Sequence, residues 1–239
     1  MSSEQSLHNI SLLEGLATTR SIRRYTNEPI SEDALRDIMF AATRAPSGSN
    51  RQGFRFMVFT DSAKSLEVKK LIAQGARMLW SQKSVNDGYN AGSAVREDSP
   101  KARMARTMDE YVTNMPNVPV LVLGCLVRHR EPNPEEGASV YPACQNLLLA
   151  ARALGYGGVL TGFHGFVEKE LRELLEIPQG TAISATITLG KPAGKHGPVR
   201  RAPMKELIYG DTWGEGATWA VDPPGTQHTE RYIEKKKEK

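Results

Sequence analysis

Residues 118–127 read Val-Pro-Val-Leu-Val-Leu-Gly-Cys-Leu-Val, the longest apolar run in the chain. A continuous apolar run of this kind is typical of a central strand that is buried on both faces of its sheet. It is far too short to cross a bilayer, because a transmembrane helix needs about 20 apolar residues. The run therefore predicts the middle of a β-sheet in a protein without a membrane-spanning segment.

Further strands and helices are expected on either side of this run. Residues 54–59 predict a buried strand, residues 182–189 alternate apolar and hydroxyl side chains as a half-buried strand does, and Val159 and Leu160 predict a short strand. Helices are expected at 7–18, at 32–44 after an N-cap at Ser31, and at 62–80, 141–154 and 167–175. This order lacks the regular alternation of a doubly wound sheet and predicts a layered α+β domain.

Two regions are less regular. Residues 81–116 are rich in Ser, Asn, Gly and Asp, and predict a lid or excursion with a loop first and a helix later. A surface insertion without a role is the alternative. Beyond Gly190 the chain is rich in Pro and Gly and predicts an extended arm, which ends in the basic stretch 235–239.

Composition limits the classes of function. The 239 residues are 39% hydrophobic and 24% charged, as in an ordinary globular protein of one domain or two small ones. The N-terminus shows no secretory signal, and the two cysteines, Cys125 and Cys144, predict buried thiols without a disulfide; a cytoplasmic location fits best. The net charge of +4 suits a small anionic ligand and does not demand a nucleic acid.

Several familiar catalytic signatures are absent from the sequence. It contains no P-loop, no HExxH, no CxxC pair and no serine nucleophile elbow. The pair Gly155 and Gly157 follows a helix and precedes a strand, which is the reverse of the dinucleotide fingerprint. These absences argue against a metal site and against a Rossmann pocket for a nicotinamide.

Two polar segments remain as candidates for a binding site. Residues 18–25, Thr-Thr-Arg-Ser-Ile-Arg-Arg-Tyr, place three guanidinium groups within five residues, and the planar fork of arginine suits phosphate. Residues 46–52, Pro-Ser-Gly-Ser-Asn-Arg-Gln, offer hydroxyls, amides and backbone N–H groups at a helix end. By themselves they predict an anion site and a polar loop, or equally a solvated turn and an ordinary connector.

The combination and order of these segments resemble the NAD(P)H-dependent nitroreductase-like flavoproteins. Residues 19–25 and 45–52 match two of that family's motifs, residues 160–163 fall where it has a short flavin-facing strand end, and residues 178–207 resemble its C-terminal signature. The resemblance covers roughly residues 13–214. It implies a three-layer α-β-α sandwich with a central, mostly antiparallel sheet, and an intertwined homodimer with FMN at the subunit interface. It also implies an FMN-binding domain at 1–215 and a C-terminal extension at 216–239.

The resemblance implies cofactor contacts by position. They fall on Arg20, Ser21, Ile22, Arg23, Arg24, Pro46, Ser47, Gly48, Ser49, Asn50, Gln52, Leu160, Thr161, Gly162, Arg200 and Arg201. Arg23 would lie near the pyrimidine edge of the flavin and Arg201 near its phosphate, while Ser47 and Ser49 would come from the partner subunit. No side chain is expected to act as a catalytic acid or base, because the flavin does the chemistry.

The implied activity is a ping-pong reductase. NADPH or NADH would reduce FMN and leave, and a small-molecule acceptor, a nitroaromatic, nitrofuran or quinone, would then bind in its place. Alternatives within the family are a dehalogenase, a flavin destructase or an oxidase, and outside enzymology a flavin-sequestering protein. The sequence departs from the family at Thr19, where an arginine is frequent, and at Gln52-Gly53-Phe54, where Gln-Pro-Trp is usual. Ser21 replaces the acid of the destructase.

Other side chains are expected to be structural. His164 stands in a loop without an evident partner, and Met104, Met108 and Met115 have the spacing of a helix core, with a substrate cap as the alternative.

Overall fold

The computed structural model describes residues 10–229, which divide into two compact units between His196 and Gly197. The N-terminal unit contains the sheet and six of the helices, and the C-terminal unit contains one short helix. The basic stretch at 235–239 lies outside the described residues. The functional boundary after residue 215 stays a prediction.

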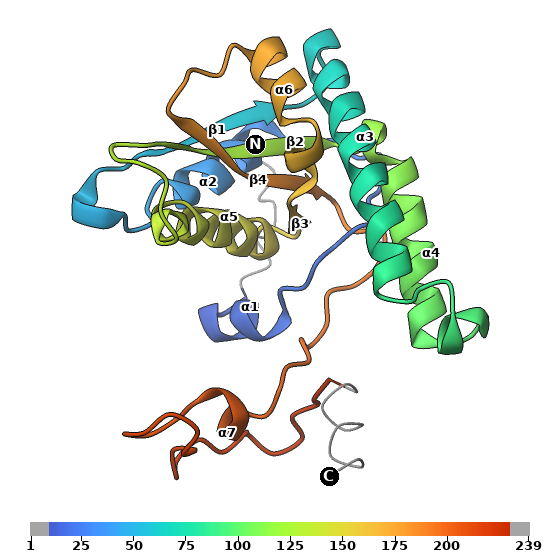
Figure 1. The fold of residues 1–239 in the computed structure, drawn as a ribbon, viewed down its shortest axis with the longest axis vertical. Coiled ribbons are helices and arrows are strands. Elements are labelled where there is room, and N and C mark those ends of the chain that lie inside the picture. The colour runs from blue at the N-terminus through green and yellow to red at the C-terminus, as the bar shows by residue number, and fades with distance from the viewer. Residues whose placement is uncertain (1–9, 230–239) are drawn as a thin grey trace, which may run out of the picture. The chain divides into compact units, whose positions relative to one another are not determined.

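The N-terminal unit is built on a four-stranded sheet (Figure 1). Its strands are β1 (Phe54–Phe59), β2 (Val120–Val127), β3 (Gly157–Thr161) and β4 (Thr181–Gly190). Their order is β1-β2-β4-β3, and every neighbouring pair is antiparallel. The predicted α+β fold with an antiparallel central sheet is confirmed, and the apolar run at 118–127 forms one of the two central strands.

Strand β2 is buried on both faces, as predicted. Leu121 and Leu123 belong to the apolar cluster on one face of the sheet, whereas Val120 and Val122 belong to the cluster on the other face. All four side chains are at most 2% exposed. Burying each contributes roughly 1.5–3 kcal/mol, so this strand joins the two halves of the core.

Helices cover both faces of the sheet (Figure 1). The first face is covered by α3 (Ala63–Asn86), α4 (Pro100–Thr113) and α6 (Glu168–Leu175). The second is covered by α2 (Glu32–Ala42) and α5 (Tyr141–Ala153), and α1 (Leu12–Thr18) packs against α5. This arrangement is the predicted three-layer α-β-α sandwich. Of the helix expected at 7–18, residues 7–9 lie outside the described residues.

Serine side chains fix where four of the helices begin. Ser11, Ser31, Ser62 and Ser99 are the N-caps of α1, α2, α3 and α4, and each hydroxyl accepts a hydrogen bond from the backbone N–H three residues later. Such a cap satisfies one of the N–H groups that a helix start leaves unpaired. The predicted N-cap at Ser31 is confirmed.

The helix expected to end at Trp80 continues to Asn86, so the prediction of a loop from residue 81 is wrong at its start. Trp80 is buried, lies 5.2 Å from the ring of Tyr89 and donates to Asp109 at 2.5 Å. These contacts to α4 hold the last turns of α3 against its neighbour. Region 81–116 therefore contains the end of α3, a connection at 87–99 with a 3₁₀ helix at Gly92–Val95, and α4.

Strand β4 is buried on both faces rather than on one. The hydroxyl of Thr188 lies 2.8 Å from the phenol oxygen of Tyr25 and 2.7 Å from that of Tyr111, and the hydroxyl of Thr186 lies 3.0 Å from Nδ1 of His164. Both threonines are 0% exposed. The alternating hydroxyl residues of β4 predicted a solvent-facing side of the strand. Their hydroxyls instead face buried hydrogen-bond partners.

The C-terminal unit has little regular structure, as the extended arm predicted. Its helix α7 (Met204–Leu207) is followed by a turn in which the rings of Tyr209 and Trp213 lie 5.1 Å apart. Trp213 and Trp219 are 89% and 69% exposed within this chain. Across residues 10–229, no helix is both long and apolar enough to span a membrane.

Candidate functional site

The segment Arg20–Arg24, here called the arginine segment, runs along the outer edge of β3. The N–H of Ile22 donates to the carbonyl of Gly158 at 3.0 Å, and the carbonyl of Arg24 accepts from Ala193 at 3.0 Å. Ile22 is buried against Gly157, where an added Cβ would lie 2.6 Å from Ile22 Cγ1. Ile22 thus anchors the segment, while Arg20 and Arg24 are exposed and Arg23 is half-buried.

These arginines line a cavity of about 380 Å³. The opposite wall comes from the N-terminal half of α4, with Arg103 and Met104, and from Lys195 after β4. Arg24 is paired with Glu110 at 2.6 Å. Within residues 10–229 Arg23 has no such partner, and its buried Nε has no hydrogen bond. The cavity is therefore strongly positive, and one of the arginines that line it has an unsatisfied donor.

The second segment, Pro46–Gln52, here called the serine loop, has an unusual backbone. Ser49, Asn50 and Gln52 have φ values of 52°, 51° and 51°, in the left-handed region that favours glycine. The hydroxyl of Ser47 accepts from the N–H of Gln52 at 2.8 Å and closes the loop. Strain of this kind persists only where surrounding structure enforces it, and it is frequent at binding sites.

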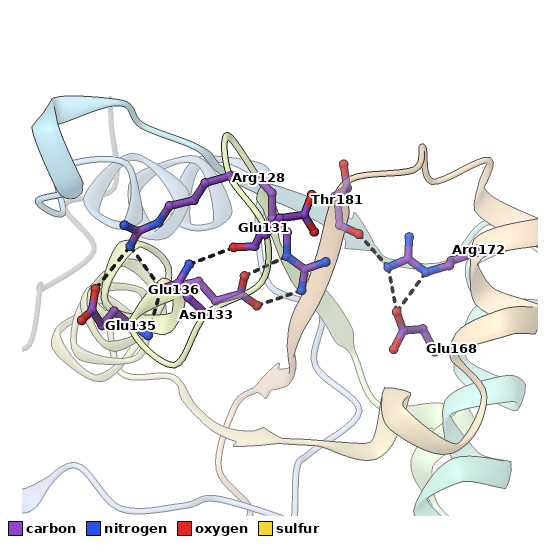
Figure 2. A network of polar contacts seen from close by, with 9 residues as sticks. Arg128, Glu131, Asn133, Glu135, Glu136, Glu168, Arg172 and Thr181 are labelled. Carbon is purple, nitrogen blue, oxygen red and sulfur yellow. Dashed lines mark hydrogen bonds and ion pairs between the residues drawn. The ribbon is translucent and has the colours of Figure 1, made fainter.

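Figure 2 shows a polar network around Arg128 and Glu136, and a separate hydrogen bond links the 3₁₀ helix of Glu136 to the serine loop. The hydroxyl of Ser139 accepts from the N–H of Gly48 at 3.3 Å. Ser139 ends a short 3₁₀ helix whose first residue, Glu136, accepts two hydrogen bonds from Arg128 at 2.7 and 2.8 Å. These bonds lower the pKa of Glu136, because they stabilise its ionised form. In the same view Arg172 donates to the carbonyl of Thr181 at the start of β4.

The two segments lie at opposite edges of the sheet. The arginine segment follows the edge formed by β3, whereas the serine loop leads into β1 at the other edge. Within residues 10–229, no hydrogen bond or ion pair links them. One chain alone therefore does not bring the two groups of predicted residues together.

The end of β3 has one exposed side, and its other side is hydrogen-bonded to β4. Leu160 is 39% exposed, and Gly162 has open space where a Cβ would be. The hydroxyl of Thr161 donates to the backbone carbonyl of Thr186, and the side-chain hydroxyl of Thr186 lies 3.0 Å from Nδ1 of His164. Burial lowers the pKa of His164, and the contact of its ring with the hydroxyl of Thr186 gives it the structural role expected from the sequence.

Arg200 and Arg201 belong to the C-terminal unit. Arg200 donates to Gln227 at 3.1 Å, and the carbonyl of Arg201 accepts from the N–H of Thr229 at 3.2 Å. Their contact with a cofactor stays a prediction.

Sequence reasoning missed several basic residues around the cavity. Arg103 and Lys195 line it, although no motif marks either of them. Met104 also lines it and is 40% exposed, whereas Met115 is fully buried in the core, so only part of the methionine series is helix core. Cys125 and Cys144 are buried free thiols, as predicted.

Comparison with known proteins agrees with this geometry. The sequence model of the Nitroreductase family matches residues 16–191. The chain belongs to the nitroreductase family. A relative from Archaeoglobus fulgidus named "Putative NADH dehydrogenase/NAD(P)H nitroreductase" is 30% identical over 75% of this chain and 84% of its own length. The "FMN reductase [NAD(P)H]" of Bacillus subtilis is 25% identical over 84% of this chain and 74% of its own length.

A solved structure from Desulfovibrio desulfuricans, titled "putative nitroreductase in complex with FMN", is similar in fold. It aligns with a TM-score of 0.62 and 28% identity, covering 85% of this chain and 98% of its own.

Proposed function

We propose that this chain is an FMN-dependent oxidoreductase that takes electrons from NADH or NADPH and reduces nitroaromatic, nitrofuran or quinone acceptors. The FMN complex of the Desulfovibrio desulfuricans relative and the name of the Bacillus subtilis relative support the cofactor and the donor. The observation that carries the proposal is the arginine-lined cavity beside β3.

The residues of this cavity fit FMN. Arg20, Arg23 and Lys195 have no carboxylate partner within residues 10–229, so their charges are free for an anion. The buried Nε of Arg23 has no acceptor among the residues that the structure describes. A buried donor without a partner costs about 1–3 kcal/mol, which a ligand acceptor would recover. A phosphate and the polar edge of a flavin supply such acceptors.

Each part of the site has a definite task. Arg23 places positive charge beside the cofactor, Gly162 leaves room for close backbone approach, and the backing of Thr161 by Thr186 keeps the strand end in position. When bound, FMN supplies the two-electron chemistry, so the protein needs to bind, orient and shield rather than to provide an acid–base pair.

A homodimer completes the site in this proposal. The serine loop lies at the sheet edge opposite the arginine segment, so a second copy is needed to bring the two together. Exposed apolar side chains offer it a surface: Leu12, Leu13 and Phe40 are 69%, 77% and 62% exposed. Apolar groups in such number on α1 and α2 are typical of an interface.

Donor and acceptor then use one site in turn, which is the ping-pong scheme. Steady-state rates at several fixed acceptor concentrations are expected to give parallel double-reciprocal lines. Intersecting lines would contradict the shared site and would leave FMN dependence untouched.

An anaerobic absorbance spectrum tests the function itself. The purified protein, reconstituted with FMN, is scanned before and after NADH or NADPH is added, and a nitroaromatic or a quinone is then introduced. Flavin bands that bleach with the pyridine nucleotide and return with the acceptor are expected. Bands that persist after both nucleotides would contradict the donor, and failure to retain FMN would contradict the cofactor.

A further inference from the structure

Helix α4 presents one of its faces to the cavity beside the arginine segment. The residues that line the cavity have the i, i+3, i+4, i+7 spacing of one helix face: Pro100, Arg103, Met104 and Thr107. One turn further along the helix, Glu110 pairs with Arg24 at 2.6 Å. This ion pair ties α4 to the arginine segment, and the N-terminal half of the helix forms the wall on the other side of the cavity.

This wall combines a charged group with an apolar one. The guanidinium of Arg103 donates to the backbone carbonyl of Asp98, which carries no charge. None of the ion pairs within residues 10–229 involves Arg103. Beside it, Met104 is 40% exposed, and a thioether packs well against aromatic rings of different shapes. The wall can therefore bind an aromatic ring and an anionic group at the same time.

The cavity carries more positive charge than the phosphate of FMN can neutralise. Five basic side chains line it, and one of them, Arg24, is paired with Glu110. A phosphate monoester carries a charge of about −1.5 to −2 near neutral pH, so the cofactor leaves roughly two positive charges without a counter-charge. Like charges that share a partly enclosed cavity attract a further anion to it.

The position of Arg103 indicates which molecule carries this further anion. The proposed cofactor lies against the arginine segment and the end of β3, whereas Arg103 belongs to the opposite wall. In NADPH the 2′-phosphate is separated from the nicotinamide by two riboses and a pyrophosphate. A charged group that lies in the same cavity of about 380 Å³ as the flavin therefore belongs to a compact acceptor.

We propose that Arg103 is a specificity-determining residue that selects aromatic acceptors bearing a carboxylate or a similar anionic group. The inference rests on the proposed function and narrows its class of acceptors. Arg103 binds the anionic group and Met104 packs against the ring, which leaves the arginine segment to the cofactor. An acceptor whose charge stands opposite its reducible group, such as 4-nitrobenzoate, meets both requirements.

The test uses two pairs of molecules that differ mainly in charge. 4-Nitrobenzoate and 4-nitrobenzamide are compared as acceptors. Benzoate and benzamide are compared as unreactive ligands of the FMN-loaded protein, detected by their effect on the flavin absorbance. The variants are Arg103→Gln and Arg103→Lys. Arg106→Gln is the matched control, because Arg106 stands on the same helix outside the cavity lining and donates to the carbonyl of Glu97 at 2.8 Å.

We expect Arg103→Gln to lower the ratio of kcat/KM for 4-nitrobenzoate to that for 4-nitrobenzamide roughly 5- to 20-fold, through KM rather than kcat. The Kd of benzoate should rise by a similar factor, while that of benzamide changes less than about twofold. Arg103→Lys keeps the charge and should retain most of the preference, and Arg106→Gln should retain all of it. FMN affinity should stay within about threefold of the wild type, because the charge of Arg103 on the far wall is screened from the phosphate.

Wild-type protein that binds benzoate no more tightly than benzamide would overturn the proposal. Equal losses for the charged and the neutral member of each pair in Arg103→Gln would overturn it too, as would a loss of FMN affinity as large as the loss for benzoate. A change confined to the preference between NADPH and NADH would assign Arg103 to the donor instead. Flavin that neither nucleotide bleaches would contradict the proposed function, and the benzoate titrations, which need no turnover, would still decide the role of Arg103.

Discussion

The arginine segment and the serine loop are both short, polar and placed at edges of the same sheet, yet they are built in opposite ways. In the arginine segment the backbone is extended and paired with its neighbours, whereas the side chain of Arg23 keeps an unsatisfied buried donor. In the serine loop the side chains of Ser47 and Gln52 are hydrogen-bonded within the loop, whereas the backbone is held in left-handed conformations.

The difference shows how each segment would contribute to one site. The arginine segment lacks counter-charge, so a ligand would stabilise it directly. The serine loop is hydrogen-bonded, but its left-handed backbone conformations cost free energy. Its contribution to the site is therefore a backbone shape that is already formed before a ligand binds. Substitutions should therefore affect the two segments through different quantities, ligand affinity for the first and backbone stability for the second.

The largest effect is expected at Gly157. In Gly157→Ala the new Cβ would lie 2.6 Å from Ile22 Cγ1 and 3.1 Å from His196 Nε2, which forces the anchor of the arginine segment to move. We expect the apoprotein to lose about 2–3 kcal/mol in urea unfolding. Gly48→Ala in the serine loop is the matched control, because its nearest atom would be Ser139 Oγ at 3.5 Å, and a loss of less than about 1 kcal/mol is expected. Similar losses in both would contradict the anchoring role of Ile22.

The next largest effect is expected in Arg23→Gln, as a loss of affinity for FMN. Removing the charge and the buried donor is expected to weaken FMN binding roughly 10- to 100-fold without destabilising the apoprotein, because the donor is unsatisfied when no ligand is bound. Ser47→Ala, which removes only the bond that closes the serine loop, is expected to weaken it about threefold. Isothermal titration of both apoproteins decides the order, and a reversed order would mean that the serine loop supplies most of the binding energy.

A gain in stability is expected from Ser49→Gly. Its φ of 52° suits glycine, so the unliganded protein should become more stable by about 0.5–1 kcal/mol while FMN affinity falls. Ser47→Gly is the control, since Ser47 has an extended backbone with φ −144° and its hydroxyl bonds to Gln52, and it should lose stability. A loss in both variants would show that Ser49 is not strained.

The smallest effect concerns the network behind the serine loop. Because the folded-state pKa of Glu136 is lowered by Arg128, its stabilising effect is fully present above the unfolded value of about 4.5 and is lost as the pH falls through the lower, folded value. Glu136→Gln should remove this acid-side dependence, with a loss of less than about 1 kcal/mol at neutral pH. Unfolding curves at neutral pH and below pH 4.5 measure it, and an unchanged slope would contradict the ion pair.

Local sequence patterns predicted the fold best where the residues of a segment alone determine its structure. The run at 118–127 is apolar throughout and became a strand buried on both faces, and Ser31 capped its helix as expected. Prediction failed where contacts with residues remote in the sequence determine the burial of a side chain or the end of a helix. Thr188 is buried because Tyr25 and Tyr111 reach it from remote parts of the chain, and α3 continues past Trp80 because Asp109 of α4 binds its indole.

The candidate site divides in the same way. Arg20 and Arg23 could be proposed from sequence because three arginines stand together in one motif. Arg103 and Lys195 could not, since they stand in ordinary helical and loop contexts and reach the cavity only through the position of α4 and the return of the chain after β4.

Mixed dimers test the central claim, that the arginine segment of one chain and the serine loop of another form one site. A variant with Arg20→Gln and Arg23→Gln, which is expected to retain little FMN, and a variant with Ser47→Ala and Ser49→Ala, which is expected to bind FMN more weakly than the wild type, are unfolded together and refolded. Each mixed dimer would contain one site with every defect and one intact site, so FMN binding at wild-type affinity should reappear in the mixture. No recovery of binding, although differently tagged subunits do co-purify, would contradict the shared site.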